Sequence, residues 1–325
     1  MRVAVTGSTG HIGSVLVPQL VAAGHDVRAL VYGDASVLDG VAVERVTVDV
    51  RDRESLDAAL AKQDVVIHLA AFISVRAADD AMMHAVNVDG VRHVAEAALA
   101  ARVGRMVHVS SVHAYRTWRL PGPLVETDPA ALDATDPIYD RTKALGEVEL
   151  RKVIARGLNA TILNPVGVIG PSDHLPSLMG ATLRDMYTRD LPLLPSGGFC
   201  WVDVRDVADA ALMAMTHGAV GANHLLSGGY LDVKELHAIV RECGGGAPLM
   251  RVPTFVLGLI PPLMGALRLS GLLPSSFTAD ALYALRTRLE VDASLARTAL
   301  SFEPRCVRQS VRDGIAWWRE TGALA

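Results

Sequence analysis

A tyrosine and a lysine stand four residues apart in the segment Tyr139-Asp140-Arg141-Thr142-Lys143. In a helix this spacing places both side chains on one face. A free tyrosine has a pKa of about 10 and exchanges protons poorly at neutral pH. A nearby ammonium group lowers the pKa of the phenol, because its positive charge stabilises the phenolate. The pair can therefore exchange a proton with a substrate oxygen, which is typically worth about 10²–10⁴ in rate.

Two serines, Ser110 and Ser111, end an apolar run about 30 residues before this pair. If the run is a strand of a parallel sheet, its carboxyl end faces the ligand crevice. A serine hydroxyl there can hydrogen-bond the oxygen that receives the proton. The residues alone leave open which of the two serines does so.

A glycine-rich segment, Thr6 to Gly13, joins the first apolar run to a helical pattern. Its glycines allow a tight turn and a close approach of the backbone to a diphosphate. The helix that follows offers unpaired N–H groups and the positive end of its dipole to that anion. The segment predicts a dinucleotide site formed by Gly7, Thr9, Gly10, His11, Ile12 and Gly13.

Apolar runs and helical patterns alternate along the first half of the chain. Strands are expected at Val3–Val5, Val27–Val31, Val43–Val48, Val65–Leu69, Arg105–Ser110 and Ala160–Leu163. Helices are expected at His11–Ala23, Ser55–Ala61, Asn87–Ala101 and Tyr139–Arg156. This alternation predicts an α/β fold of Rossmann type, a doubly wound parallel sheet with helices on both faces.

The alternation becomes irregular beyond Asn164-Pro165, where prolines interrupt the pattern. We therefore expect a Rossmann domain that binds NAD or NADP at residues 1–165. Residues 166–325 are expected to form a smaller, mixed substrate-binding portion. Within it, residues 199–216 are expected to pack back on the first domain.

The composition limits the function further. The 325 residues are half hydrophobic and carry a net charge of −4, which fits a globular rather than a disordered chain and gives no reason to expect a nucleic-acid partner. The three cysteines have no CxxC spacing, so neither a metal site nor a disulfide framework is expected. Unpaired cysteines fit a reducing compartment, so we expect a cytoplasmic location. The apolar segment 252–274 is interrupted by proline and glycine, which favours a buried stretch over contact with a membrane.

The residue that contacts the adenosine ribose is expected at the end of the strand Val27–Val31. An acidic residue there suits the 2′-hydroxyl of NAD, and a nearby arginine suits the 2′-phosphate of NADP. Val31 stands where the acidic residue is expected and Tyr32 stands where the arginine is expected, so neither rule is met. Asp34 could serve NAD and Arg28 could serve NADP, so the sequence predicts either cofactor.

Together, the GxxGxxG spacing after Thr6, the serine pair and the YxxxK pattern resemble the extended branch of the short-chain dehydrogenase/reductase superfamily, the NAD-dependent epimerase/dehydratase family. The resemblance implies that Ser111, Tyr139 and Lys143 are catalytic, with Ser110 as the alternative serine. It implies cofactor contacts at Tyr32, Asp49, Val50, Leu69, Ala70, Ala71, Asn87, Tyr139, Lys143, Pro165 and Val168. A helix N-cap is an alternative role for Asn87, and close packing is an alternative for residues 69–71.

The substrate side departs from the pattern of nucleotide-sugar epimerases. Asn164 replaces their usual arginine, and Ser196-Gly197-Gly198 supplies no cation for a diphosphate. The chain instead resembles dihydroflavonol reductases and hydroxysteroid dehydrogenases. This implies hydride transfer between nicotinamide and a carbonyl or secondary alcohol of a largely apolar small molecule. The alternative is a nucleotide-sugar epimerase or dehydratase that retains NAD.

Extended relatives often dimerise through the helix that bears the tyrosine. Ala144, Val148, Val153 and Ile154 are the residues expected to supply an apolar surface for such a contact. The resemblance therefore implies a homodimer.

Overall fold

A computed structural model describes residues 1–74, 77–117, 122–175, 177–188, 193–246, 250–252 and 289–324. The strands of its main sheet are β1 (Arg2–Thr6), β2 (Asp26–Val31), β3 (Glu44–Thr47), β4 (Val65–His68), β5 (Arg105–Val109), β6 (Ala160–Pro165) and β10 (Asn223–Leu226). All seven are parallel, in the order β10-β6-β5-β4-β1-β2-β3. The predicted Rossmann-type fold is confirmed, and the chain changes direction across the sheet between β1 and β4.

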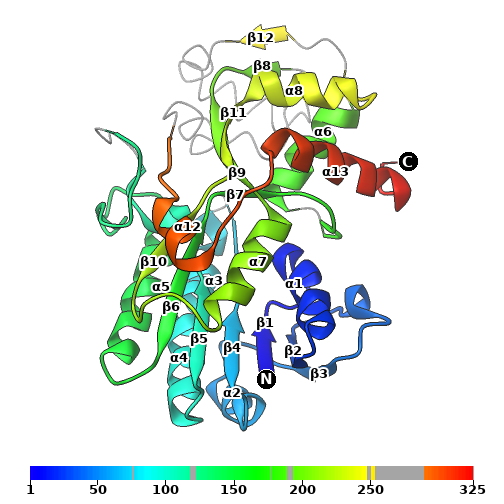
Figure 1. The fold of residues 1–325 in the computed structure, drawn as a ribbon. Coiled ribbons are helices and arrows are strands. Elements are labelled where there is room, and N and C mark those ends of the chain that lie inside the picture. The colour runs from blue at the N-terminus through cyan, green and yellow to red at the C-terminus, as the bar shows by residue number, and fades with distance from the viewer. Residues whose placement is uncertain are drawn as a thin grey trace.

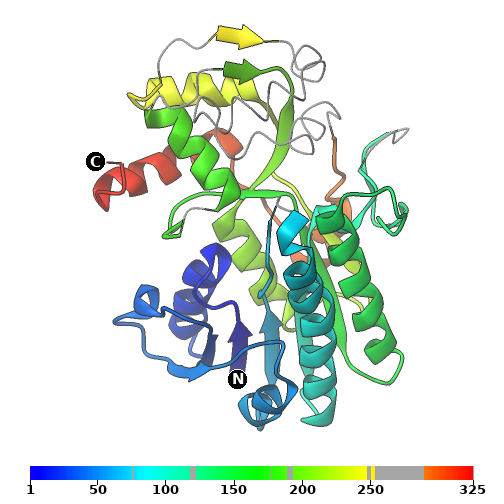
Figure 2. The same cartoon turned by 180° about the vertical axis from the view of Figure 1, so that it is seen from behind.

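Helices cover both faces of this sheet (Figures 1 and 2). One face carries α1 (His11–Ala22) and α7 (Val204–Ala214), and the other carries α2 (Arg53–Leu60), α4 (Val91–Ala100) and α5 (Ile138–Ile154). Successive strand residues are buried on opposite sides, as the two-residue period of a strand requires. In β1, Val3 and Val5 pack with α1 and α7, whereas Ala4 packs with α2 and α4.

The helix expected to begin at Asn87 begins earlier. It comprises α3 (Asp80–His84), a π-helical turn η3 (Ala85–Gly90) and α4 in unbroken succession. Asn87 is buried in the middle of this run, where its side chain bonds other parts of the chain. Asn87, which was expected to start the helix, therefore lies inside it and makes hydrogen bonds to residues distant in the chain. Short 3₁₀ turns lie at η1 (Ser36–Leu38), η2 (Ala77–Asp79) and η4 (Val112–Ala114).

The carboxyl ends of β1 and β4 point toward a smaller part of the molecule (Figure 1). Its mixed sheet has the order β11-β9-β7, from β7 (Gly167–Ile169), β9 (Gly198–Asp203) and β11 (Gly229–Asp232). A second sheet pairs β8 (Leu193–Pro195) with β12 (Met250–Val252). Helices α6 (Leu178–Thr188), α8 (Val233–Glu242) and α13 (Val307–Glu320) belong here, and α12 (Ser294–Leu300) lies beside β10. A separate core that includes Trp201, Ile239 and Trp318 holds this part together.

The division expected at residue 165 is not a boundary of the main sheet. Strand β10 comes from beyond residue 220 and pairs with β6. Helix α7, which follows β9, packs against α1 through the core of the main sheet. Apart from Val252, the apolar segment 252–274 lies outside the described residues. In the described part of the chain, no helix is both long and apolar enough to cross a membrane.

Candidate active site

Helix α5 brings Tyr139 and Lys143 to the carboxyl edge of the sheet. Ser111 follows the end of β5 and begins the turn η4, where its hydroxyl accepts a hydrogen bond from the His113 N–H at 3.2 Å. The Ser111 side chain also acts on the Tyr139 phenol, whose pKa it lowers. Lys143 is 4% exposed and Ser111 is 8% exposed. Of the three residues predicted to be catalytic, Ser111 and Lys143 are thus buried and Tyr139 is half-buried. The Ser110 hydroxyl is buried with no partner among the described atoms.

Burial dominates the electrostatics of this trio. It raises the pKa of Tyr139 above its ordinary value, and the adjacent Asp140 adds to this, while the hydrogen bond from Ser111 opposes it. Burial also lowers the pKa of Lys143 to about 8, against the opposing charge of Glu147. Tyr139 is therefore a protonated phenol at neutral pH. Lys143 stays charged at neutral pH at the cost of desolvation.

A histidine–carboxylate pair stands beside the tyrosine. The His113 Nδ1 lies 2.9 Å from Asp140 Oδ1, and the His113 ring meets the Tyr139 ring edge-on at 5.4 Å between centroids. Burial acts to lower the pKa of His113, but the Asp140 carboxylate prevails and the pKa is raised. At mildly acidic pH, His113 therefore carries a positive charge next to Tyr139. His113 and Asp140 are far apart in the chain, and no sequence signal predicted this pair.

Two further histidines are buried close to Lys143. His68 ends β4 and His108 lies in β5, and their rings stack at 5.3 Å. The His68 Nδ1 is 2.6 Å from the Thr6 hydroxyl. Burial first, and then the charge of Lys143, lowers the pKa of His68 to about 3, and His108 is lowered in the same direction. Both rings are therefore neutral at physiological pH and add no positive charge next to Lys143.

The glycine loop has the shape that a diphosphate site needs. Gly7 has a φ of +66°, and a Cβ there would lie 2.7 Å from the Ala70 nitrogen. A Cβ on Gly13 would lie 2.3 Å from the Gly7 oxygen. Gly10 caps α1 without a side-chain hydrogen bond, and the first turn of α1 has no acidic residue. The amide groups of this turn are therefore open to an anion, and the loop fits the diphosphate of a dinucleotide.

The other residues of the loop differ in what their side chains contact. Thr9 and Ile12 are half-buried next to the loop glycines. The His11 ring turns away from them, since its Nε2 lies 3.0 Å from the Pro171 oxygen and its Nδ1 lies 3.9 Å from Asp173. His11 thus contacts the smaller part of the molecule through its side chain, and its expected cofactor contact remains a prediction.

Asn87 holds the loop that follows β4. Its Oδ1 accepts a hydrogen bond from the Phe72 N–H at 2.8 Å, and its Nδ2 donates to the Phe72 oxygen at 2.9 Å and to Thr142 at 3.2 Å. The N-cap interpretation of Asn87 is therefore wrong, and local backbone support is what the structure shows. Helix α5 approaches this segment so closely that a Cβ on Gly146 would lie 2.2 Å from the backbone oxygen of Asn87. Leu69, Ala70 and Ala71 form the start of the supported loop.

Where the adenosine is expected, the structure adds an arginine that no sequence pattern indicated. Arg51 pairs with Asp49, with its Nε 2.9 Å from Oδ2, and its Nη2 donates to the Tyr32 hydroxyl at 3.4 Å. This hydrogen-bonded arginine lowers the pKa of Asp49. Tyr32 is 69% exposed at the end of β2. The side chain of Val50 is buried in the core, so only its backbone can face a ligand.

The nicotinamide end is expected at Pro165 and Val168. Pro165 ends β6 and is buried, and Val168 is half-buried in β7. The preceding Asn164 donates a hydrogen bond to the Ser111 oxygen at 3.0 Å. The end of β6 is therefore joined directly to the segment that carries the predicted catalytic serine.

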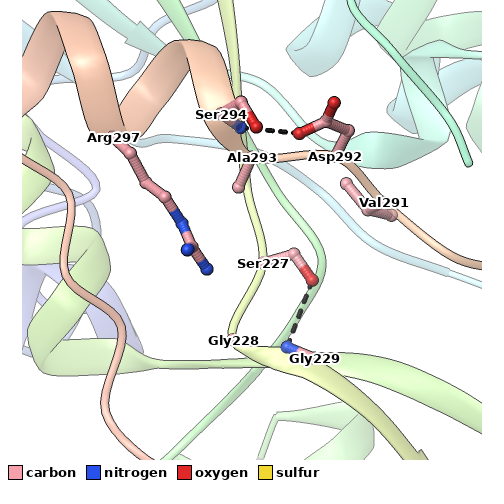
Figure 3. Close-up of a pocket in the computed structure, with 8 residues that line it drawn as sticks. All are labelled: Ser227, Gly228, Gly229, Val291, Asp292, Ala293, Ser294 and Arg297. Atoms are coloured by element: carbon pink, nitrogen blue, oxygen red, sulfur yellow. Dashed lines mark hydrogen bonds between the residues drawn. The ribbon is translucent and has the colours of Figure 1, made fainter.

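A pocket of about 240 Å³ opens elsewhere, between the β10–β11 turn and α12 (Figure 3). Its lining residues are Ser227, Gly228, Gly229, Val291, Asp292, Ala293, Ser294 and Arg297. Arg297 points from α12 toward Gly228 (Figure 3). The lining includes none of the predicted site residues, so we do not place the reaction in this pocket.

A doubly wound parallel sheet, an open glycine loop after β1 and a Ser–Tyr–Lys cluster at the carboxyl edge define a short-chain dehydrogenase/reductase of the extended type. Comparison with known families agrees. The model of the NAD dependent epimerase/dehydratase family matches residues 3–226, which is more than half of the chain. The chain belongs to this family.

Individual relatives resemble the whole chain. It is 34% identical to "Sterol demethylase protein B" of Methylococcus capsulatus over 100% of both chains. It is 26% identical to a "Putative dihydroflavonol 4-reductase" of Synechocystis, with 98% of this chain and 94% of that one covered. Among solved structures, gox2253 superposes with a TM-score of 0.86 at 28% identity, over 99% of this chain and 98% of the other.

Proposed function

We propose that this chain is an NAD(P)-dependent oxidoreductase that transfers hydride between nicotinamide and a carbonyl or secondary alcohol of a largely apolar substrate. The observation that carries the proposal is that the buried Ser111 side chain acts on the pKa of the Tyr139 phenol, with the buried Lys143 one turn further along α5. These three groups provide a proton donor, an oxygen-binding hydroxyl and a charge in one buried cluster. A protein that only senses a dinucleotide has no use for such a cluster.

Each residue has a distinct part in this reaction. A bound nicotinamide cofactor supplies or accepts the hydride. During reduction Tyr139 donates its phenolic proton to the substrate oxygen, and Ser111 holds that oxygen by a hydrogen bond. The Lys143 ammonium favours the phenolate that remains and binds the nicotinamide ribose. During oxidation the same groups work in reverse, with Tyr139 taking the proton.

Two observations support an apolar substrate. The names of two relatives that cover nearly the whole chain refer to a sterol and to a dihydroflavonol, both of which are polycyclic molecules with large apolar surfaces. The segment Ser196-Gly197-Gly198, which leads into β9, offers no cation to pair with the diphosphate of a nucleotide sugar.

Cofactor titration followed by a substrate screen tests the proposal. Purified protein, freed of carried-over nucleotide, is titrated with NADPH and with NADH, and polycyclic ketones are then screened by the loss of absorbance of the reduced cofactor. We expect releasable cofactor and turnover of a ketone, with Tyr139→Phe as the inactive control. NAD that is retained through turnover would instead support a nucleotide-sugar epimerase or dehydratase. Binding of neither nucleotide would contradict the proposal.

The proposal includes a homodimer in the cytoplasm, but the predicted contact surface needs correction. Ala144 and Val153 are buried in the subunit's own core, so they are not available to a partner. Val148 and Ile154 on α5 are half-buried and remain available. Analytical ultracentrifugation is expected to show a dimer, and a monomer at micromolar concentration would overturn this part.

A further inference from the structure

A network of buried polar side chains lies directly behind the Ser–Tyr–Lys cluster. At its centre is Glu147, which is 7% exposed and stands one turn beyond Lys143 on α5. Its Oε1 accepts a hydrogen bond from Asn164 Nδ2 at 2.7 Å, and its Oε2 accepts one from Asn223 Nδ2 at 2.8 Å. A buried carboxylate is costly unless such bonds compensate for the lost water, so its presence here calls for a reason.

The bonds of this network are complete. The second N–H of Asn164 donates to the Ser111 oxygen at 3.0 Å, and the second N–H of Asn223 donates to Asn164 Oδ1 at 2.9 Å. The remaining oxygen of Asn223 accepts a hydrogen bond from Arg151. Both hydrogens and the oxygen of each amide group are therefore used, which fixes the orientation of both asparagines. A saturated network of this kind holds its members rigidly.

The network touches the predicted site at two points. Through Asn164 it holds the backbone of Ser111, whose hydroxyl contacts Tyr139. Through its charge, Glu147 acts on Lys143 four residues earlier on the same helix face, and opposes the effect of burial on that ammonium. The strands that carry the asparagines, β6 and β10, are neighbours at the edge of the sheet. One carboxylate thus connects α5, β6 and β10 to the site.

We propose that Glu147 is a positioning residue of the proton-transfer site, which orients Ser111 through Asn164 and keeps the Lys143 ammonium charged. This role rests on the proposed function, because it assigns work to Ser111 and Lys143 in proton transfer. Glu147 itself touches neither substrate nor cofactor in this account. The structure also explains why a charged residue is needed, since a neutral amide would supply one acceptor where the two asparagines require two.

Several charged or titratable groups act on Lys143 and Glu147, and the test must separate the effect of Glu147 from the effects of the others. On Lys143 these are His68 of β4, His108 of β5, His113 of η4 and Glu147 of α5. On Glu147 they are Lys143, Arg151 at 3.9 Å and Tyr115, whose pKa is raised first by burial and then by Glu147. His68 and His108 are neutral over the range of interest. A variant of Glu147 therefore changes the one negative charge in this set that acts on Lys143.

Titration of the lysine side chains tests the proposal without the use of activity. The chain has four lysines, Lys62, Lys143, Lys152 and Lys234, so protein labelled with [13Cε]-lysine gives few NMR signals, and Lys143→Arg assigns the one of interest. In Glu147→Gln we expect the pH midpoint of the Lys143 signal to fall by about one pH unit, because the negative charge that raises the pKa of this lysine is lost. Glu149→Gln is the matched control, because Glu149 is on the same helix and pairs with Lys152 at 2.6 Å. It should leave the Lys143 midpoint unchanged.

A second variant keeps the proposal testable if Glu147→Gln does not fold. Asn164→Ala retains the carboxylate but cuts its link to Ser111, so the Lys143 midpoint should stay near the wild-type value. With a turned-over ketone, kcat should fall by about tenfold to a hundredfold through misplacement of Ser111, while the Kd for the cofactor stays the same.

The outcomes separate this inference from the proposed function. An unshifted Lys143 midpoint in Glu147→Gln, or wild-type kcat in Asn164→Ala, would overturn the role of Glu147 in an otherwise active enzyme. A shifted midpoint in a protein that binds cofactor but reduces no carbonyl would contradict the proposed function, and would leave the electrostatic effect of Glu147 established.

Discussion

The two ends of the predicted cofactor site are built in opposite ways. At the nicotinamide end, Ser111 and Lys143 are 8% and 4% exposed, and a saturated network stands behind them. At the adenosine end, Tyr32 is 69% exposed, and Arg51 and Asp49 form a partly exposed pair. Proton transfer needs groups with shifted pKa values, which require burial. Recognition of a ribose needs only hydrogen bonds and charge, which an open surface can supply.

The largest expected effect comes from the buried end. Tyr139→Phe removes the proton donor and leaves the ring that packs beside His113. We expect kcat to fall by about 10²–10⁴, whereas the Kd for the cofactor changes little. Steady-state kinetics and fluorescence titration measure the two quantities. If Tyr139→Phe kept the wild-type kcat, Tyr139 would not be the proton donor, and the proposed proton-transfer role of the nicotinamide end would be contradicted.

The loop between the two ends should be the next most sensitive place. Gly13→Ala sets a Cβ 2.3 Å from the Gly7 oxygen, so backbone must move. We expect a loss of about 3 kcal/mol in the free energy of unfolding, the upper end for overpacking, together with weaker cofactor binding. Gly122→Ala is the control, since a Cβ there meets no described atom within 4 Å. Equal thermal denaturation curves for the two variants would contradict the packing described for the loop.

The buried end should also cost the protein stability. Burial lowers the pKa of Lys143 to about 8 from an ordinary 10.5, so between these values the unfolded chain binds more protons than the folded one. The contribution of Lys143 to stability therefore rises with pH across this window, and the destabilisation is fully present below pH 8.

Lys143→Met removes this destabilisation. At pH 7 the variant should be more stable than the wild type by about 2 kcal/mol, although it is inactive, and the difference should vanish toward pH 10.5. Urea denaturation at several pH values measures it. A variant that is less stable than the wild type at pH 7 would show that Lys143 is not strained by burial.

The smallest effect is expected at the open end. Arg51 lies beside Tyr32, where a 2′-phosphate would be recognised. Arg51→Gln should weaken binding of NADPH about tenfold relative to NADH, because one charge-assisted hydrogen bond is lost. Isothermal titration with both cofactors at two salt concentrations measures the ratio. If Arg51→Gln leaves that ratio unchanged, Arg51 does not read the 2′ position.

The difference between the two ends also marks how far the sequence could be interpreted. The glycine loop and the Tyr139–Lys143 pair are local patterns in which spacing determines geometry, so their positions followed from the sequence. The alternation of strands and helices likewise predicted the Rossmann-type fold. These features depend on residues that are near one another in the chain.

The features that were missed depend on distant residues. Glu147 and Asn223 are 76 positions apart and meet only because β10 pairs with β6 beside α5. Tyr32 and Arg51 meet because β2 and β3 are neighbours. Asparagine often starts a helix, but Asn87 lies inside one, where its side chain bonds Phe72. Without the strand order, no spacing rule predicts such pairs.

The transfer of deuterium from cofactor to substrate tests the central claim most directly. Wild type and Tyr139→Phe are each given reduced cofactor with both C4 hydrogens replaced by deuterium, [4,4-²H₂], and a polycyclic ketone, in a single turnover analysed by mass spectrometry. The account predicts one deuterium on the carbinol carbon of the product with the wild type, and little product with the variant. Tightly bound cofactor with no deuterium in any product, or equal transfer by both proteins, would contradict it.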